Sequence, residues 1–302
     1  MADGSQAAAD AAREAREEVL EQEQPAKPPE SKAQLRKRVR EEKAAEKVKA
    51  KKLGYKNFLV NVWVTDFNPY EFGIYKHKRN RAKSRQFTAD TDIIAEVVED
   101  GKRTGVIGYR EALWKQRTGT DKRLVFKLFN ETLNWRATMD LMLARSLQKT
   151  LGARGIPVMS FAVNLANYNF VVYVERSDNK WPLMPDNFSF FLMDERQPRF
   201  YRLRRAFISL GGDYTIYDQK DTVIGHIDGK LLSFGKWYGT VREDHADRNM
   251  MMVLQLFSAM LGFHRTCKRH VRDLAQDVMS GAVKPSLERQ ETDLYMNPRR
   301  VR

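Results

Sequence analysis

The chain has 302 residues, of which 42% are hydrophobic, 11% aromatic and 30% charged, and its formal net charge is +14 at pH 7. This composition allows a substantial core, and the positive charge favours polyanionic partners without choosing among phospholipid headgroups, RNA and DNA. The single cysteine, Cys267, excludes an intramolecular disulfide, and no apolar run approaches the ~20 residues of a membrane-spanning helix, so we expect a cytoplasmic protein whose membrane contacts are peripheral.

The region 1–54 is predicted to be a charged, partly disordered N-terminal extension. Residues 1–30 are rich in Ala, Glu and Gln and end in a proline-rich segment, which is typical of a frayed helix followed by a linker. Residues 31–56 carry eleven Lys or Arg against three Glu, and they predict a basic helix that is solvated, with or without a specific partner. Because the first residues lack a basic segment followed by an apolar one, we expect neither a secretory signal nor a transit peptide.

Strand patterns begin at Tyr55, where the sequence becomes alternating and aromatic. Glu99-Asp100-Gly101-Lys102 predicts a hairpin turn between two of these strands. The spacing of apolar residues predicts a helix over 134–151, which Gly152, Gly155 and Pro157 would end. The predicted strands of this first half are 58–64, 72–78, 92–98, 104–109 and 124–129.

The second half ends in the most informative segment, Asn249–Phe263, which has fifteen residues, no charge and apolar side chains on every face of a helix. Such a helix must be buried on all sides, and its length of roughly 22 Å falls short of the roughly 30 Å of a bilayer core. The strands predicted before it are 158–165, 168–175, 188–193, 200–210, 214–218, 222–228, 230–234 and 236–241.

The order of these elements predicts a mainly β (α+β) fold. About 12 antiparallel strands can close into a barrel wide enough to hold a helix. We therefore expect a closed barrel around the C-terminal hydrophobic helix, with one crossing helix at 134–151. The barrel domain is predicted to span residues 55–272 and to be followed by a C-terminal tail, residues 273–302.

The segment 200–235 carries a strand, a turn and a second strand with regularly placed glycines and aspartates. The motif positions are Leu210, Gly211, Asp213, Tyr214, Ile216, Tyr217, Asp218, Val223, Gly225, Ile227, Gly229 and Lys230. In this order and spacing the segment resembles the tubby C-terminal-like superfamily, especially its LURP-one-related and phospholipid-scramblase branches. The resemblance implies a twelve-strand barrel around a central hydrophobic helix, and functions such as phosphoinositide binding, lipid scrambling or regulation.

These motif residues also have local physical explanations. Asp218 and Asp221 would bracket a turn through side-chain hydrogen bonds to the backbone. Gly225 would permit a tight bend or close packing, and Asp228-Gly229 would supply a positive φ. None of these roles is catalytic.

Two basic clusters are candidate polyanion sites. The first puts six Lys or Arg within residues 76–85, in a segment predicted to be a long loop that wraps a phosphate. The second lies on a predicted strand, where alternation directs Arg202 and Arg204 to one face. For both clusters ordinary solvent exposure is the alternative. The residues of the first cluster are Lys76, Lys78, Arg79, Arg81, Lys83 and Arg85.

No metal, cofactor or catalytic group is predicted. His264, Cys267 and His270 are spaced by three, but on a helix the outer two lie about 120° apart, which does not suit a metal site. Cys267 fits a buried small hydrophobic residue. We expect Asp247 to cap the apolar helix, because the acidic residues before that helix lack the alternating oxygen ligands of a calcium loop.

The sequence therefore favours a non-enzymatic binding or scaffold module that contacts anionic phospholipid headgroups or an acidic protein surface through basic loops. Two alternatives stay open. One is scramblase-like phospholipid translocation, which would need the apolar helix to enter lipid. The other is a subunit associated with nucleic acid or ribonucleoprotein, which would use residues 31–56 as a basic arm.

Overall fold

The computed structural model describes residues 54–62, 86–88, 90–177, 185–194, 197–206, 212–229, 235–284 and 291–292. Several predictions lie outside these residues. They are the extension up to residue 53, the strands 72–78 and 230–234, the basic cluster at 76–85, the motif residues Leu210, Gly211 and Lys230, and most of the C-terminal tail after residue 284.

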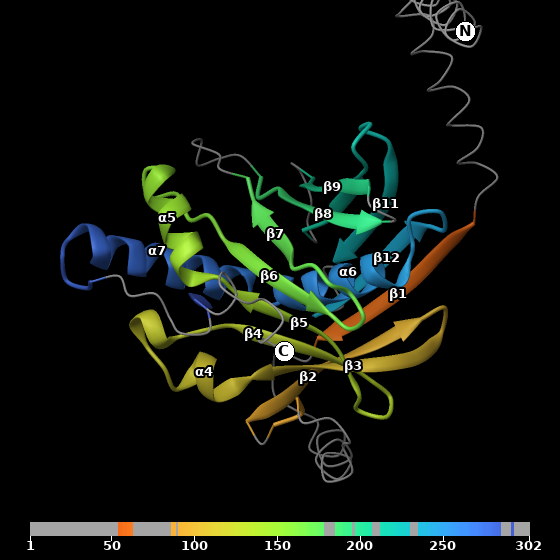
Figure 1. The fold of residues 1–302 in the computed structure, drawn as a ribbon, viewed down its shortest axis with the longest axis horizontal. Helices are drawn as coiled ribbons and strands as arrows, with labels where there is room; N and C mark the ends of the chain where they lie inside the picture. Colours follow the sequence, from red (N-terminus) through yellow and green to blue (C-terminus); the bar gives the residue numbers. More distant parts are fainter. Residues whose placement is uncertain are drawn as a thin grey trace, which may run out of the picture. The chain divides into compact units, whose positions relative to one another are not determined.

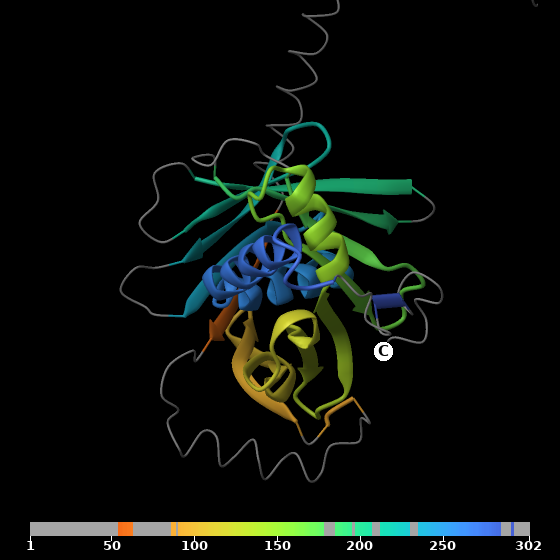
Figure 2. The same ribbon diagram turned by 90° about the vertical axis from the view of Figure 1, so that its left-hand side faces the viewer.

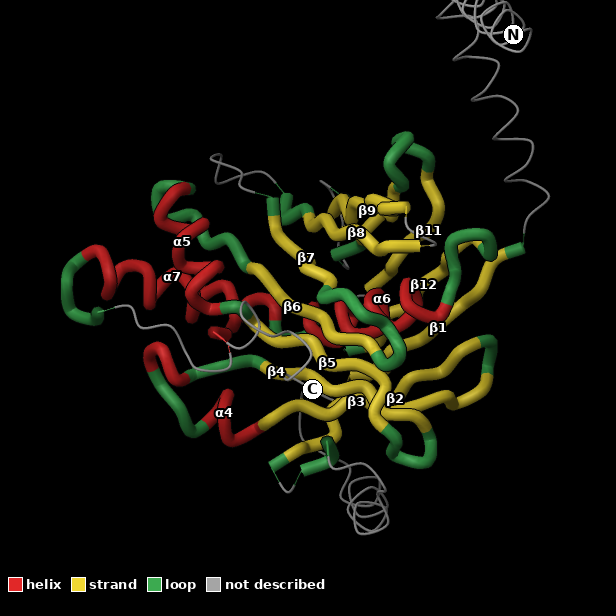
Figure 3. The backbone as a smooth tube through the Cα atoms, in the orientation of Figure 1, coloured by secondary structure: helices red, strands yellow, loops and turns green. Residues whose placement is uncertain are grey.

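Twelve antiparallel strands form a closed barrel, which confirms the predicted fold class (Figures 1 and 3). Each strand pairs with its neighbours in sequence, and β1 closes the barrel on β12 with Tyr55 opposite Arg242. The strands are β1 (Tyr55–Val62), β2 (Thr91–Glu99), β3 (Lys102–Arg110), β4 (Val125–Asn130), β5 (Trp135–Leu141), β6 (Ser160–Leu165), β7 (Val172–Arg176), β8 (Phe188–Asp194), β9 (Gln197–Arg205), β10 (Tyr214–Tyr217), β11 (Val223–Gly229) and β12 (Lys236–Arg242).

Helix α6 (Arg248–Leu261) lies inside the barrel and forms its core, as the uncharged sequence predicts. Every residue from Met250 to Met260 is buried, and the ring of Phe257 packs against Phe188 of β8 and Tyr214 of β10 at centroid distances of 5.1 and 5.3 Å. In Figure 2 the blue helices lie between the strands drawn above them and those drawn below them. In the described part of the chain, no helix combines the length and the apolar character needed to cross a membrane.

The prediction of one helix over 134–151 was wrong in its first half. Residues Trp135–Leu141 are strand β5, and helix α5 (Leu143–Gly152) follows. Both faces of β5 are covered: Met139 is buried on one face, while Asp140 is buried on the other, paired with Arg123. Within the strand, apolar and polar residues alternate. The helical spacing arises because Trp135 and Met139 of β5 are read together with Met142, Leu143 and Leu147 beyond its end.

The apolar helix does not continue into the charged segment after it. A separate amphipathic helix, α7 (His264–Met279), begins after the junction at Gly262-Phe263 and buries Cys267, Val271, Leu274 and Ala275. Helix α5 packs against α7. Together with the short helix α4 (Glu111–Lys115) and a 3₁₀ turn at Gly119–Asp121, they lie at one end of the barrel, at the left in Figure 1.

The opposite end of the barrel is formed by five hairpins and is called the hairpin end here. The connections β2–β3, β4–β5, β6–β7, β8–β9 and β10–β11 turn there, and α6 begins there after β12. The turn between Glu99 and Lys102 confirms the predicted hairpin, because Asp100 and Gly101 have φ of 45° and 81°. The Asp100 carboxylate also accepts the backbone N–H of Asn57 at 3.0 Å, which ties this hairpin to β1.

Candidate anion-binding pocket

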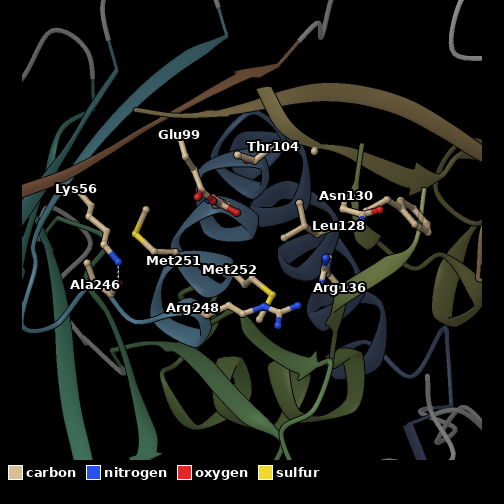
Figure 4. Close-up of a pocket in the computed structure, with 13 residues that line it drawn as sticks. Lys56, Glu99, Thr104, Leu128, Asn130, Arg136, Ala246, Arg248, Met251 and Met252 are labelled. Carbon is tan, nitrogen blue, oxygen red and sulfur yellow. Dashed lines mark hydrogen bonds between the residues drawn. The ribbon is translucent and has the colours of Figure 1, made fainter. Parts of the chain in front are cut away.

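A pocket of about 320 Å³ opens at the hairpin end, beside the first turns of α6 (Figure 4). Its walls come from β1, the facing ends of β2 and β3, the end of β4, the start of β5 and α6. These segments are far apart in sequence and meet because α6 enters the barrel at this end. The pocket is at the small end of the usual size range of ligand sites, ~300–1,000 Å³.

Three cationic side chains reach this pocket from three elements: Lys56 from β1, Arg136 from β5, and Arg248 from the first position of α6. Lys56 Nζ donates a hydrogen bond to the carbonyl oxygen of Ala246 at 2.9 Å. Within the described residues, the guanidinium groups of Arg136 and Arg248 form no ion pair with a carboxylate. Two like charges thus face one pocket, and within the described residues neither of them is ion-paired.

The carboxylate among the described lining residues is that of Glu99, and it already has a partner. Gln255 of α6, which is 2% exposed, donates its side-chain N–H to Glu99 Oε1 at 2.6 Å. Three cations against one anion give the lining a formal charge of +2. Asp247, which caps α6, is not among the lining residues.

The pocket has a cationic rim and an apolar floor. Lys56 and Arg248 are exposed and Arg136 is half-buried. By contrast, Met251 and Met252 are each 5% exposed and contribute thioether and methylene groups to the floor. Figure 4 shows the two methionines in the middle of the pocket, with the cationic side chains around them.

Sequence reasoning did not identify this pocket. Arg136 lies within the segment that the sequence predicts as a helix. The direction of its side chain is set by the register of strand β5, which that prediction does not contain. Lys56 was included in the basic stretch 31–56 without a role of its own. Arg248 immediately precedes the apolar run, and a lone charge at the start of a buried helix was the one available signal.

The second predicted basic cluster has the predicted orientation. In β9 the side chains of Tyr201 and Leu203 are buried, and Arg202 and Arg204 lie on the other face. Both arginines form ion pairs with Asp221, and Arg204 also lies 4.8 Å from the ring centroid of Tyr217. This exposed cluster therefore contains its own counter-charge, unlike the arginines of the pocket.

Of the two aspartates predicted to bracket the turn, Asp218 behaves as predicted, whereas Asp221 has a φ of 62° and its carboxylate pairs with Arg202 and Arg204. The Asp218 carboxylate accepts the backbone N–H groups of Lys220 and Thr222, each at 2.8 Å. A Cβ on Gly225 would lie 2.2 Å from the backbone oxygen of Thr240, so this position requires the close packing that only glycine allows.

One motif prediction was wrong. Asp228 and Gly229 do not form a turn with positive φ; they continue β11, opposite Tyr238 and Trp237 of β12. The backbone N–H of Gly229 instead donates to the Asp213 side chain at 3.1 Å. The two motif isoleucines, Ile216 and Ile227, are fully buried in the core.

The three metal-ligand candidates on α7 do not converge on one site. His264 Nε2 lies 3.2 Å from Asp186, and His270 Nε2 lies 3.2 Å from the carbonyl oxygen of Lys122. Cys267 is buried as predicted, and burial raises the pKa of its thiol to about 12. In the ranges that the structure describes, no cluster of three His, Cys, Asp or Glu side chains could hold a metal ion.

The predicted cap of α6 is confirmed. Asp247 accepts the backbone N–H of Met250 at 2.8 Å, which satisfies one of the free donors at the start of the helix. The neighbouring Asp244 pairs with Arg242 at 2.6 Å, and Glu243 is exposed. These carboxylates therefore serve the turn between β12 and α6.

Comparisons of the chain with protein-family models, with curated proteins and with solved structures found no match. The resemblance to the tubby-like families therefore stays a prediction that rests on the motif in residues 200–235. The barrel around α6 and the pocket at its hairpin end are the structural basis for a functional proposal.

Proposed function

We propose that the chain is a non-enzymatic binding module whose pocket at the hairpin end takes the headgroup of an anionic phospholipid. The observation that carries the proposal is the convergence of Lys56, Arg136 and Arg248 on one pocket that has a formal charge of +2. The motif resemblance supports the same ligand class, since members of the tubby-like families have been linked to phosphoinositide binding.

The guanidinium groups of Arg136 and Arg248, which form no ion pair within the described residues, are the chemical reason for an anion. Charge-assisted hydrogen bonds from arginine to phosphate are short, directional and frequently bidentate. The start of α6 adds backbone N–H groups and the positive end of a helix dipole, which Asp247 partly offsets. A phosphate between Arg136 and Arg248 would relieve the repulsion of the two cations.

The composition of the pocket supports binding rather than catalysis. Its described lining residues include no Ser, Cys, His or Asp side chain. The hydroxyl of Thr104 is not hydrogen-bonded to a base within the described residues, and the Glu99 carboxylate accepts its hydrogen bond from Gln255. A nucleophile with an adjacent general base, which covalent catalysis needs, is therefore missing from the described lining.

The two alternatives receive no support from the described residues. Translocation would require α6 to leave the barrel, yet every face of Met250–Met260 is packed. The nucleic-acid hypothesis depends on residues 31–56, nearly all of which lie outside the described ranges.

Titration calorimetry with a soluble headgroup, such as inositol trisphosphate, and co-sedimentation with vesicles with and without anionic lipid would test the proposal. We expect the double variant Arg136→Gln/Arg248→Gln to lose at least about ten-fold in affinity, since a hydrogen bond to a charged group contributes ~1.5–3 kcal/mol. The matched control is Arg117→Gln/Arg265→Gln, which removes two exposed arginines at the other end of the barrel. Unchanged binding in the pocket variant, or indifference of the wild type to anionic headgroups at low salt, would overturn the proposal.

A further inference from the structure

We infer that the pocket at the hairpin end takes a single-chain anionic amphiphile, with its charged head at the arginines and the first methylenes of its chain on the methionine floor. This inference rests on the proposed anion-binding function and specifies the ligand further. A headgroup alone would satisfy the cationic rim and leave the apolar floor uncovered.

The division of the pocket into two chemical zones is the first argument. The rim groups Lys56 and Arg248 are exposed to solvent, whereas Leu128, Met251 and Met252 are at most 5% exposed. A ligand that matches both zones carries a charge at one end and an apolar segment next to it. The volume of about 320 Å³ suits a head and a few carbons rather than a whole two-chain lipid.

The second argument is the adaptability of the floor. The first turns of helix α6 contain three consecutive methionines, Met250–Met252, whereas the rest of its core-facing surface uses mostly branched, aromatic or small residues. Methionine is unbranched and has three rotatable bonds, so it can change rotamer and admit a chain without disturbing the backbone. The floor can therefore deepen locally while Gln255 and Glu99 keep their hydrogen bond.

The third argument concerns orientation. Lys56 and Arg248 are exposed at the mouth, Arg136 is half-buried and the methionines are buried, so the chain enters first and the charged head remains near the surface. This is the arrangement for a lipid monomer that has left a membrane. A headgroup that enters the pocket from a bilayer would keep its chains outside.

The experiment compares three probes by titration calorimetry below their critical micelle concentrations: 1-acyl-glycerol 3-phosphate, glycerol 3-phosphate and the uncharged monoacylglycerol. We expect the acylated phosphate to bind more tightly than glycerol 3-phosphate by about four-fold for each methylene on the floor, so three methylenes give about 60-fold. Monoacylglycerol should bind weakly, because it lacks the charge.

Two variants test whether the methionine floor causes the higher affinity of the acylated probe. Met252→Gln should reduce the advantage of the acylated probe by about ten-fold and leave glycerol 3-phosphate unchanged. The control Met193→Gln changes a methionine of β8 outside the pocket and should alter neither affinity. If Met252→Gln does not fold by circular dichroism, a series of chain lengths on the wild type replaces it, and affinity must rise with length.

The outcomes separate the two proposals. Equal affinities for glycerol 3-phosphate and its acylated form would overturn the amphiphile inference and leave the anion-binding function standing. Binding of neither phosphate would overturn both. Tight binding of monoacylglycerol that Arg136→Gln/Arg248→Gln does not affect would show nonspecific association and also overturn the inference.

Discussion

Asp186 is the centre of a buried group of charges near the junction of α6 and α7. It is 4% exposed and receives hydrogen bonds from Arg176 Nε at 2.5 Å and from Lys268 Nζ at 2.9 Å, and His264 Nε2 lies 3.2 Å away. Burial by itself raises the pKa of Asp186, but His264, Arg176 and Lys268 outweigh it and hold the pKa well below the usual 3.8. The ionised form therefore stabilises the fold.

We expect Asp186→Asn to lower the free energy of unfolding by about 3–5 kcal/mol at neutral pH, because Arg176 is left buried without its counter-charge. Since the folded pKa is depressed, the contribution of Asp186 is fully present above the unfolded pKa near 3.8 and declines as the pH falls below it. Urea unfolding at a series of pH values should show that the difference in free energy of unfolding between wild type and variant becomes smaller in acid. A difference in free energy of unfolding that does not change with pH would contradict this account. The control is Asp273→Asn, at an exposed position.

We expect a single methyl group added at Gly225 to destabilise the fold. Its Cβ would meet the backbone of β12, 2.2 Å from the Thr240 oxygen, and backbone cannot move aside as a flexible side chain can. We predict that Gly225→Ala lowers the free energy of unfolding by about 1–3 kcal/mol. Gly152→Ala, where nothing lies within 4 Å, should be neutral or slightly stabilising in the same urea titration. Equal effects at the two glycines would disprove the steric explanation.

Among the elements, α5 depends on a residue from the far end of the chain. The residue before it, Met142, provides no side-chain cap. Instead, the carboxylate of Glu291, which is 3% exposed, accepts the backbone N–H groups of Ala144 and Arg145 at 3.0 and 3.1 Å. Free backbone N–H groups at the start of α5 are thereby satisfied by a residue that lies 147 positions away in the sequence.

Glu291→Ala should therefore destabilise α5 from a distance. We expect a loss of about 1 kcal/mol, as for other helix caps, and faster hydrogen exchange at the amides of Ala144 and Arg145. Exchange followed by nuclear magnetic resonance would test this, with the exposed Glu131→Ala as the control. If the first turn of α5 exchanges at the wild-type rate, Glu291 is not its cap in solution.

At the scale of the whole barrel, the burial of α6 depends on strands from both ends of the sequence. The helix contacts β1, β4, β5, β6 and β12, and the closing pair joins Tyr55 to Arg242. Such long-range pairing predicts slow folding and a cooperative core. The backbone of α6 is accessible to solvent when this closed barrel opens.

We accordingly predict that the amides of Met250–Met260 exchange more slowly than those of the exposed face of α7, in buffer without detergent or lipid. Their exchange should require global unfolding, so the opening free energy should match that from urea titration. Hydrogen-exchange mass spectrometry of the two helices provides the comparison. Fast exchange in α6 that detergent suppresses would favour a lipid-seeking helix and contradict the buried-core interpretation.

The sequence alone determined the features that depend on neighbouring residues. Fifteen uncharged positions in a row specify a buried helix whatever surrounds it, and Asp100-Gly101 specify a tight turn because they tolerate positive φ. Alternation placed Arg202 and Arg204 on the outer face of β9. Each of these properties follows from local geometry, so it can be predicted before the partners are known.

The tertiary structure alone decided which distant residues meet. Arg136 and Arg248 lie more than a hundred positions apart, and they share a pocket because α6 enters the closed barrel beside the start of β5. The same holds for Asp140 of β5 and Arg123, which lie 17 positions apart and form a buried ion pair. Closure of β1 on β12 sets these long-range distances, and no local pattern of residues encodes them.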